Sequence, residues 1–183
     1  MDDGSTDYTA DVVSTFDSKV RLISTPNYGV QHARNVGADA ANTEWITFCD
    51  SDDIFTKHYI ETLEKFINEA SSVDLIFTNF TFFRKDWRGY DMHSKAPPTY
   101  FEDLCMTLGF YVNITDLYVK ILDYQPLWPT GMSIRKQAFI DLGGYDERMQ
   151  GIRSEDLEFT LRAVARLKTA VCSKPLVDIR RHS

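Results

Sequence analysis

Helical and β-prone stretches alternate between residues 8 and 79, and this alternation limits most what the chain can fold into. Spacing of the apolar residues predicts helices over 8–16, 31–41 and 56–67 and strands over 20–24, 45–49 and 73–79. A helix between two strands carries the chain back across the sheet, which favours parallel pairing. The sequence therefore predicts an α/β fold with a mostly parallel, twisted sheet and helices on both faces.

The second half is less regular. Residues 80–129 are rich in aromatic side chains and read as a variable insert, with a helix predicted over 101–111. After it, strands are predicted over 131–134, 170–172 and 176–179 and helices over 135–142 and 154–167. At 183 residues, we expect one domain over 1–183.

Composition narrows the class of protein. The chain is 43% hydrophobic, which is enough to fold, and the net charge of −7 argues against nucleic-acid binding. No apolar run reaches the ~18 residues that span a bilayer, and no signal peptide is recognisable, so we expect a cytoplasmic protein. Three widely spaced cysteines, Cys49, Cys105 and Cys172, favour buried thiols over disulfides or a metal knuckle.

Acidic residues are concentrated near the start. The first 53 residues hold ten acidic and three basic side chains, whereas the remaining 130 hold 17 of each. Within this part, Asp50-Ser-Asp-Asp53 follows a predicted strand directly, and such oxygen ligands suit Mg²⁺ or Mn²⁺. A solvated acidic face, with Asp52 or Asp53 capping the next helix, is the alternative interpretation.

Three further motifs could either stabilise the local fold or take part in binding and catalysis. Asp2-Asp-Gly-Ser-Thr-Asp7 is a good helix start. Arg34 can pair with a diphosphate or with nearby acids. Glu155 and Asp156 lie in the first turn of a predicted helix, where they stabilise its dipole, and a carboxylate placed there could also act as a general base.

Taken together and in this order, these motifs resemble the family 2 glycosyltransferases, whose Rossmann-like fold is called GT-A. The resemblance spans nearly the whole chain. The matching segments are Asp2-Asp-Gly-Ser-Thr-Asp7, Gly29-Val-Gln-His-Ala-Arg-Asn35, Phe48-Cys-Asp-Ser-Asp-Asp53, Leu142-Gly-Gly-Tyr-Asp-Glu147, Glu155-Asp156 and Ile179-Arg-Arg-His182.

The resemblance implies a role for each matching position. Asp156 would be the general base that deprotonates an acceptor hydroxyl, with inversion at the anomeric carbon. The nucleotide-sugar-binding residues would be Asp2, Asp3, Arg34, Asp50 and Glu155. Mn²⁺ or Mg²⁺ would be bound by Asp52, Asp53 and His182.

The resemblance also implies partners. The donor would be a UDP-, GDP- or dTDP-sugar, and the acceptor a saccharide or glycolipid in the synthesis of a surface polysaccharide or glycolipid. Residues 1–79 would bind the donor and residues 80–183 would form the variable insert and acceptor-binding half. A peripheral position at the inner face of the membrane and a homodimer are further expectations. A non-catalytic sugar-nucleotide or cation-binding module is the alternative, and a nucleotidyltransferase ranks third because no glycine-rich basic loop for a triphosphate is present.

One departure concerns the sheet. Members of this family begin with a strand before the Asp-Asp-Gly-Ser element, and that strand is absent from this sequence. We therefore expect Asp2 and Asp3 at the carboxyl edge of the sheet near Asp50 and Asp52, with the helix over 8–16 packed on one face. Strands 20–24 and 45–49 should be separated by a gap one strand wide, or by a strand from another chain, and the donor site should be incomplete.

Overall fold

The computed structural model describes residues 1–16, 19–69, 72–82, 91–102, 104–152 and 154–180. Strands within these ranges form two sheets. The small sheet pairs β1 (Asp2–Asp3) with β2 (Ser24–Thr25) in parallel. The main sheet runs in the order β3 (Trp45–Thr47), β8 (Ser133–Arg135), β5 (Leu75–Phe82), β9 (Thr169–Ile179), β7 (Phe110–Val112) and β6 (Cys105–Thr107), and β4 (Ile54–Phe55) also pairs with β9.

The α/β class is confirmed, but the expected parallel character of the main sheet is wrong. Among the described strands of this sheet, only β5 and β9 pair in parallel, and the remaining pairs are antiparallel. The reason is that β8, from late in the chain, lies between β3 and β5 and runs against both. Local periodicity predicts the crossover from β3 to β5 but does not reveal which strand lies between them.

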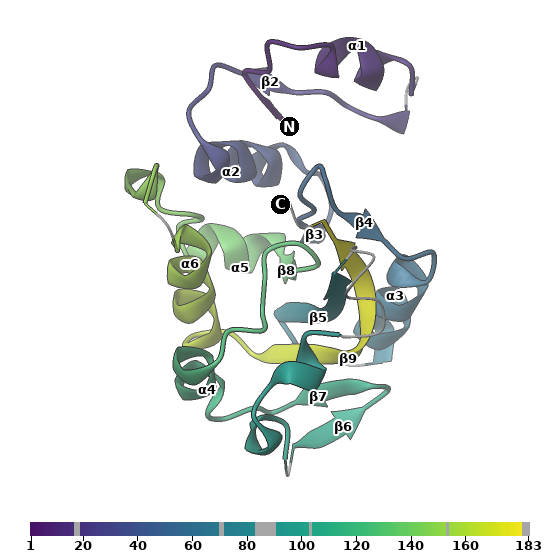
Figure 1. Cartoon of the computed structure of the whole chain (residues 1–183), viewed down its shortest axis with the longest axis vertical. Helices are drawn as coiled ribbons and strands as arrows, with labels where there is room; N and C mark the ends of the chain where they lie inside the picture. Colours follow the sequence, from purple (N-terminus) through teal and green to yellow (C-terminus); the bar gives the residue numbers. More distant parts are fainter. Residues whose placement is uncertain (17–18, 70–71, 83–90, 103, 153, 181–183) are drawn as a thin grey trace.

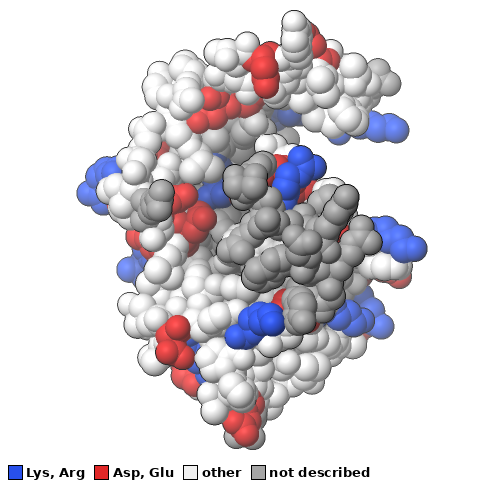
Figure 2. Space-filling model, viewed as in Figure 1, with Lys and Arg blue, Asp and Glu red and all other residues white. Residues whose placement is uncertain are grey.

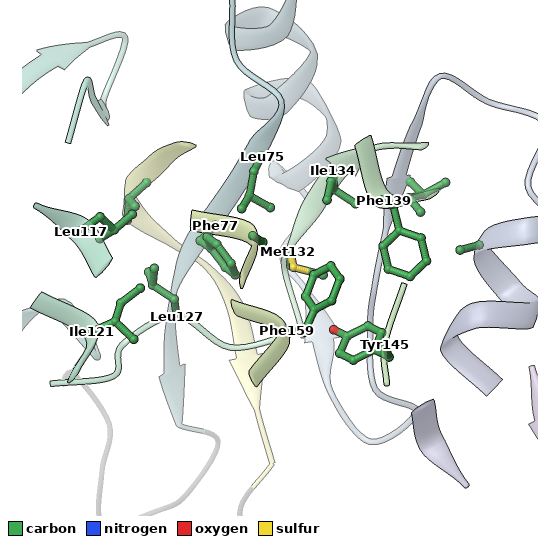
Figure 3. Packing of buried hydrophobic residues seen from close by; sticks show 14 residues of the cluster. Leu75, Phe77, Leu117, Ile121, Leu127, Met132, Ile134, Phe139, Tyr145 and Phe159 are labelled. Atoms are coloured by element: carbon green, nitrogen blue, oxygen red, sulfur yellow. The ribbon is translucent and has the colours of Figure 1, made fainter. Parts of the chain in front are cut away.

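Helices cover both faces of the main sheet (Figure 1). On one face lies α3 (Tyr59–Glu69), and on the other lie α4 (Leu117–Asp123), α5 (Lys136–Asp141) and α6 (Glu155–Val164). Successive residues of β5 point to opposite faces of the sheet. Leu75 and Phe77 pack with α4, α5 and α6 on one face, while Ile76 packs with α3 on the other. Figure 3 shows the first of these clusters, in which Phe139 and Phe159 meet above the sheet.

The helix predicted over 101–111 is wrong, because this stretch holds the β6–β7 hairpin. Leu108 and Gly109 join the two strands with φ of 53° and 84°, the conformation of a tight two-residue hairpin turn. The ring of Phe110 stacks on Phe66 of α3 at 3.9 Å between centroids, so the hairpin contributes to the core. The Leu-Gly pair was the signal for this turn.

The end of the chain also differs from its prediction. The strands expected over 170–172 and 176–179 form the single strand β9, and its register against β5 shifts between Thr78 and Phe80, opposite Pro175. Proline cannot donate a ladder hydrogen bond, which explains an irregularity there without a break in the strand.

Short 3₁₀ turns are found at His93–Lys95, Pro98–Tyr100 and Glu147–Met149.

The small sheet stands apart from the main sheet, with α2 (Val30–Ala40) between them (Figure 1). The strand predicted over 20–24 is only β2 (Ser24–Thr25), and it is not hydrogen-bonded to β3, since the two belong to different sheets. A separation one strand wide stays a prediction. Figure 2 shows the molecule hollowed on one side between these two parts.

The helix expected to pack on the sheet does not do so. It is shorter than predicted, α1 (Thr9–Ser14), and none of its residues is buried. Tyr8, Val12 and Phe16, the apolar positions that predicted the helix, are 80%, 56% and 56% exposed. The amphipathic pattern was right about the helix and wrong about its partner, because no strand of the main sheet lies beneath it.

Two of the three cysteines also contradict the expectation of buried thiols. Cys49 lies just after β3 and Cys105 lies on β6, at the edge of the main sheet, and both are exposed. Cys172 is buried in β9, as expected.

In the part of the chain that the structure describes, no helix is long and apolar enough to span a membrane.

Candidate active site

The loop that carries Asp50 is fixed by the segment before β8. The backbone N–H of Gly131 donates to the carbonyl of Phe48, and that of Phe48 donates to Met132, both at 3.0 Å. Further along, the N–H of Asp50 donates to Oγ1 of Thr130 at 3.2 Å. These bonds hold the acidic loop at the end of β3, where ligands of α/β sheets commonly bind.

Arg34 connects this loop to the first turn of α6. Its guanidinium donates to Oδ1 of Asp156 at 2.6 Å and to Oδ1 of Asp50 at 3.0 Å. Only 9% of the Arg34 side chain is exposed, against 37% for Asp156 and 45% for Asp50. Of the two partners that the sequence allowed for Arg34, the structure therefore shows the acids, and it brings together three predicted site residues from distant parts of the chain.

Charge and burial oppose each other at this bridge. Burial raises the pKa of the Asp156 carboxyl above its usual range, whereas the neighbouring Arg34 acts to lower it. Burial opposes the charge of the Arg34 guanidinium, but the Asp50 and Asp156 carboxylates raise its pKa further above the ordinary value, so this side chain stays charged. The site thus contains a half-buried carboxylate next to a permanent cation.

Asp53, from the same loop, lies beside the end of β9. Oδ1 of Asp53 accepts the backbone N–H of Arg180 at 2.9 Å, and burial raises the pKa of Asp53, with Asp52 and Asp50 adding to the effect. His182 lies outside the described residues. Within the ranges that the structure covers, no cluster of three or more His, Cys, Asp or Glu side chains forms a ready metal site.

Asp2 and Asp3 are bound into the loop between the small sheet and α2. Asp2, which is 7% exposed, accepts hydrogen bonds from the N–H of Ser5 and the hydroxyl of Ser24. Asp3 accepts the backbone N–H groups of Tyr28 and Gly29 at 2.9 and 2.8 Å, just before α2. Of the two carboxylates, Asp3 therefore orders the entry to the helix that carries Arg34. Both residues lie in the small sheet, so the expectation that they lie at the carboxyl edge of the sheet that carries Asp50 is wrong.

Glu155 lies beside Asp156 in the first turn of α6, and its charge acts to raise the pKa of Asp156. Ser154 precedes it with φ of 84°, a left-handed conformation that is uncommon for serine. The strained residue turns the chain into α6 immediately before the two acids.

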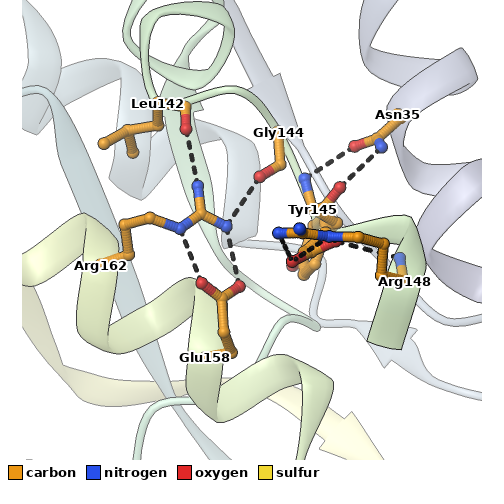
Figure 4. Close-up of polar contacts among 8 residues, drawn as sticks. Asn35, Leu142, Gly144, Tyr145, Arg148, Glu158 and Arg162 are labelled. Atoms are coloured by element: carbon orange, nitrogen blue, oxygen red, sulfur yellow. Dashed lines mark hydrogen bonds and ion pairs between the residues drawn. The ribbon is translucent and has the colours of Figure 1, made fainter. Parts of the chain in front are cut away.

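A frame of side-chain contacts ties α2 to the segment after α5 (Figure 4). Asn35 accepts the N–H of Tyr145 at 2.8 Å and donates to its carbonyl at 2.9 Å. The Tyr145 ring is stacked on Phe159 of α6 at 4.3 Å, and the Arg34 guanidinium lies 5.1 Å from the Tyr145 ring centroid. His32 and Asn35 also contact Glu147, at 3.0 and 2.9 Å.

Arg162 completes the frame from α6. It donates to the carbonyls of Leu142 and Gly144 at 2.7 and 2.9 Å and forms a two-point ion pair with Glu158 (Figure 4). Sequence reasoning missed this residue as well as Tyr145 and Asn35. The four-residue spacing of Glu158 and Arg162 on a helix was a usable signal, whereas nothing local indicated that Asn35 would bind a segment 110 residues away.

Gly144 is essential to this frame. Its φ is 64°, and a Cβ atom at this position would lie 2.6 Å from Oδ1 of Asn35. We expect Gly144→Ala to destabilise the protein by about 1–3 kcal/mol, measured by urea denaturation. Gly143→Ala is the matched control, because its φ is 84° but a Cβ there meets nothing within 4 Å. Equal losses in the two variants would show that the Asn35 contact carries no weight.

The surface cavities lie elsewhere. One, of about 420 Å³, opens between α3, α4 and the end of α6, and a second, of about 740 Å³, lies between α3 and the β6–β7 turn. Neither is lined by Arg34, Asp50 or Asp156. The candidate site is therefore identified by its charged side chains and not by the size of a cavity.

The structure combines an α/β fold with an acidic loop after β3 and a carboxylate at the start of α6. The chain matches the model of glycosyl transferase family 2 over residues 1–143 and belongs to that family. It is 37% identical over 84 residues to glycosyltransferase GlyG of Streptococcus pneumoniae, a match that covers 44% of this chain and 28% of GlyG. It is 29% identical over 117 residues to glycosyltransferase GlyA of the same organism, covering 62% of this chain and 16% of GlyA.

Solved structures agree with the family. The chain resembles S. aureus TarS 1-349, alone and in complex with UDP, with a TM-score of 0.71 and 25% identity, over 98% of this chain and 49% of that chain. The complex of TarS 1-349 with UDP-GlcNAc is 24% identical, with a TM-score of 0.71, over 100% of this chain and 48% of that one. The predicted GT-A fold is confirmed. The chain spans less than a third of these curated relatives and about half of the TarS chain.

Proposed function

We propose that this chain is the donor-binding and catalytic part of a glycosyltransferase that moves a sugar from a nucleoside diphosphate to an acceptor hydroxyl. The main support is the pair of hydrogen bonds by which the Arg34 guanidinium joins Asp50, on the acidic loop, to Asp156, on α6. Transfer needs a site for the diphosphate and a base for the hydroxyl within one cleft. Asp156 would be the base, and Asp50 lies on the loop that would hold the diphosphate through a cation.

In the proposed reaction, Asp156 accepts the proton of the acceptor hydroxyl. The hydroxyl oxygen forms a bond to the anomeric carbon while the bond from that carbon to the diphosphate oxygen breaks, and the electron pair leaves with the diphosphate. Attack from the side opposite the leaving group inverts the anomeric carbon. Asp2, Asp3, Arg34, Asp50 and Glu155 would bind the donor, and the contact between Arg34 and Asp50 supports a shared role for these two residues.

The acidic loop carries side chains that would suit a divalent cation, although the described residues form no preassembled metal site. Its donors are carboxylate oxygens, which suit Mg²⁺ and Mn²⁺, and the charges of Asp50 and Asp52 are close enough to raise the pKa of Asp53. Asp52 and Asp53 would bind the cation, and His182 would join them from beyond β9. A cation bound there would offset the negative charge of the departing diphosphate.

UDP is the nucleotide that we favour over GDP and dTDP, because the TarS structure at 25% identity was solved with UDP. The acceptor would be a saccharide or glycolipid of a surface polymer, reached through the half that begins at residue 80. Binding at the inner membrane face and homodimer formation belong to the same proposal.

Replacing Asp52 with asparagine is expected to remove the effect of Mn²⁺ on UDP binding, because the amide cannot supply the ligand charge. We expect UDP affinity in Mn²⁺ to fall roughly tenfold, or ~1.4 kcal/mol, as measured by titration calorimetry. Asp141→Asn, at an exposed position on α5, is the matched control. Unchanged UDP affinity of the Asp52 variant in Mn²⁺ would remove Asp52 from the site.

Release of UDP from UDP-GlcNAc in Mn²⁺, followed with and without added oligosaccharide acceptors, tests the function itself. An active enzyme releases UDP slowly to water and faster to a suitable acceptor. A non-catalytic module would bind the donor and release no UDP, and this result would overturn the proposal.

A further inference from the structure

Asp156 uses its two carboxylate oxygens differently. Its Oδ1 accepts the 2.6 Å hydrogen bond from Arg34, while its Oδ2 accepts no hydrogen bond from the residues that the structure describes. The side chain as a whole is 37% exposed, so one oxygen is committed and the carboxylate is still reached by solvent.

Arg34 is itself held on three sides. Its second nitrogen donates to Asp50 at 3.0 Å, and the Tyr145 ring packs against its guanidinium. Tyr145 is fixed in turn by Asn35, which lies next to Arg34 on α2, and by stacking on Phe159 of α6. Because the Arg34 guanidinium and the Tyr145 ring beside it are both held in place, the Asp156 carboxylate that binds this guanidinium has few orientations available.

We propose that Arg34 is a positioning residue for the general base, binding Oδ1 of Asp156 so that Oδ2 is the oxygen that takes the proton of the acceptor hydroxyl. This inference rests on the function proposed above and adds which oxygen reacts and what holds it. The bridge to Asp50 also fixes the base relative to the loop assigned to the donor.

The groups that face Asp156 make its ionisation depend on Arg34. Burial, Glu155 on the same helix and Asp50 across the bridge all favour the neutral acid, and Arg34 is the cation that opposes them. The buried hydroxyl of Tyr145 lies beside the same guanidinium, with a pKa raised by burial, so it stays neutral. Removing the positive charge should therefore raise the pH at which Asp156 becomes a carboxylate.

Titration of Asp156 in Arg34→Gln and Arg34→Lys tests the inference without relying on turnover. We expect the ¹³C carboxyl resonance of Asp156 to titrate at higher pH in Arg34→Gln than in the wild type, by about one pH unit or more. In Arg34→Lys the shift should be smaller, because the charge is kept while the two-carboxylate bridge is lost. The acidic limb of the turnover profile should follow the Asp156 titration in both variants.

The outcomes separate this inference from the proposed function. An Asp156 titration that does not move in either variant would overturn the positioning role even if the protein transfers sugar. A tenfold loss of UDP affinity with an unmoved titration would leave Arg34 with its donor-binding role alone and overturn the positioning role. A shifted titration in a protein that releases no UDP from UDP-GlcNAc would leave the ion pair intact but overturn the base, and with it the proposed function.

Discussion

Replacing Asp156 with asparagine is expected to lower turnover by about 10²–10⁴-fold while UDP affinity stays nearly constant, because a positioned general base contributes that much to rate. Asparagine keeps the shape and can still accept the hydrogen bond from Arg34 at Oδ1. It cannot take a proton from a hydroxyl. Turnover of a UDP-sugar by steady-state kinetics, together with UDP titration by calorimetry, measures the two effects separately.

Glu61→Gln is the matched control for this variant. Glu61 also lies in the first turn of a helix, α3, and its side chain is 83% exposed. Loss of a helix-start carboxylate alone is worth about 0.3–1 kcal/mol in stability, and the control reports that part. A collapse of UDP affinity in parallel with the rate in Asp156→Asn would mean that Asp156 acts in the donor site or in folding rather than as the base.

Truncating Phe159 to alanine is expected to destabilise the protein by about 3–5 kcal/mol, since the ring is fully buried in the cluster beneath α6. Phe159 contacts Phe139 at 5.4 Å and Tyr145 at 4.3 Å between ring centroids, so the variant leaves a cavity between α5 and α6. The same cavity removes the support beneath Tyr145. Urea denaturation gives the loss in unfolding free energy.

Phe16→Ala provides the comparison for Phe159, because this phenylalanine is 56% exposed beyond the end of α1. We expect a change within about 0.5 kcal/mol there, as for surface positions in general. Similar losses in the two variants would contradict the placement of the core beneath α6, or would show that α1 is covered in solution.

Much of the site could be anticipated because its elements carry local signals. The run of apolar residues over 45–49 that stops at Asp50 predicted a strand end with an acidic loop, and the structure places Asp50 there. The two acids before Leu157 predicted a helix start, and α6 begins at Glu155. Both features depend on neighbours within a few residues, which is the range over which sequence patterns are informative.

What could not be anticipated depends on distant partners. The antiparallel position of β8 between β3 and β5 is set by which strand fits the gap, and no local period encodes it. Likewise, the bridge from Arg34 to Asp156 joins residues 122 positions apart. The apolar residues of α1 were expected to be buried, but they are exposed. An amphipathic stripe predicts a buried face only when another part of the protein packs against it.

A crystal structure of the chain with UDP and Mn²⁺ tests the central claim most directly. The account predicts that the diphosphate lies against the Asp50–Asp53 loop, with Mn²⁺ bound by the Asp52 carboxylate and Asp156 facing the same space. UDP bound instead in the cavity between α3 and the β6–β7 turn, with the acidic loop free of metal and nucleotide, would contradict it.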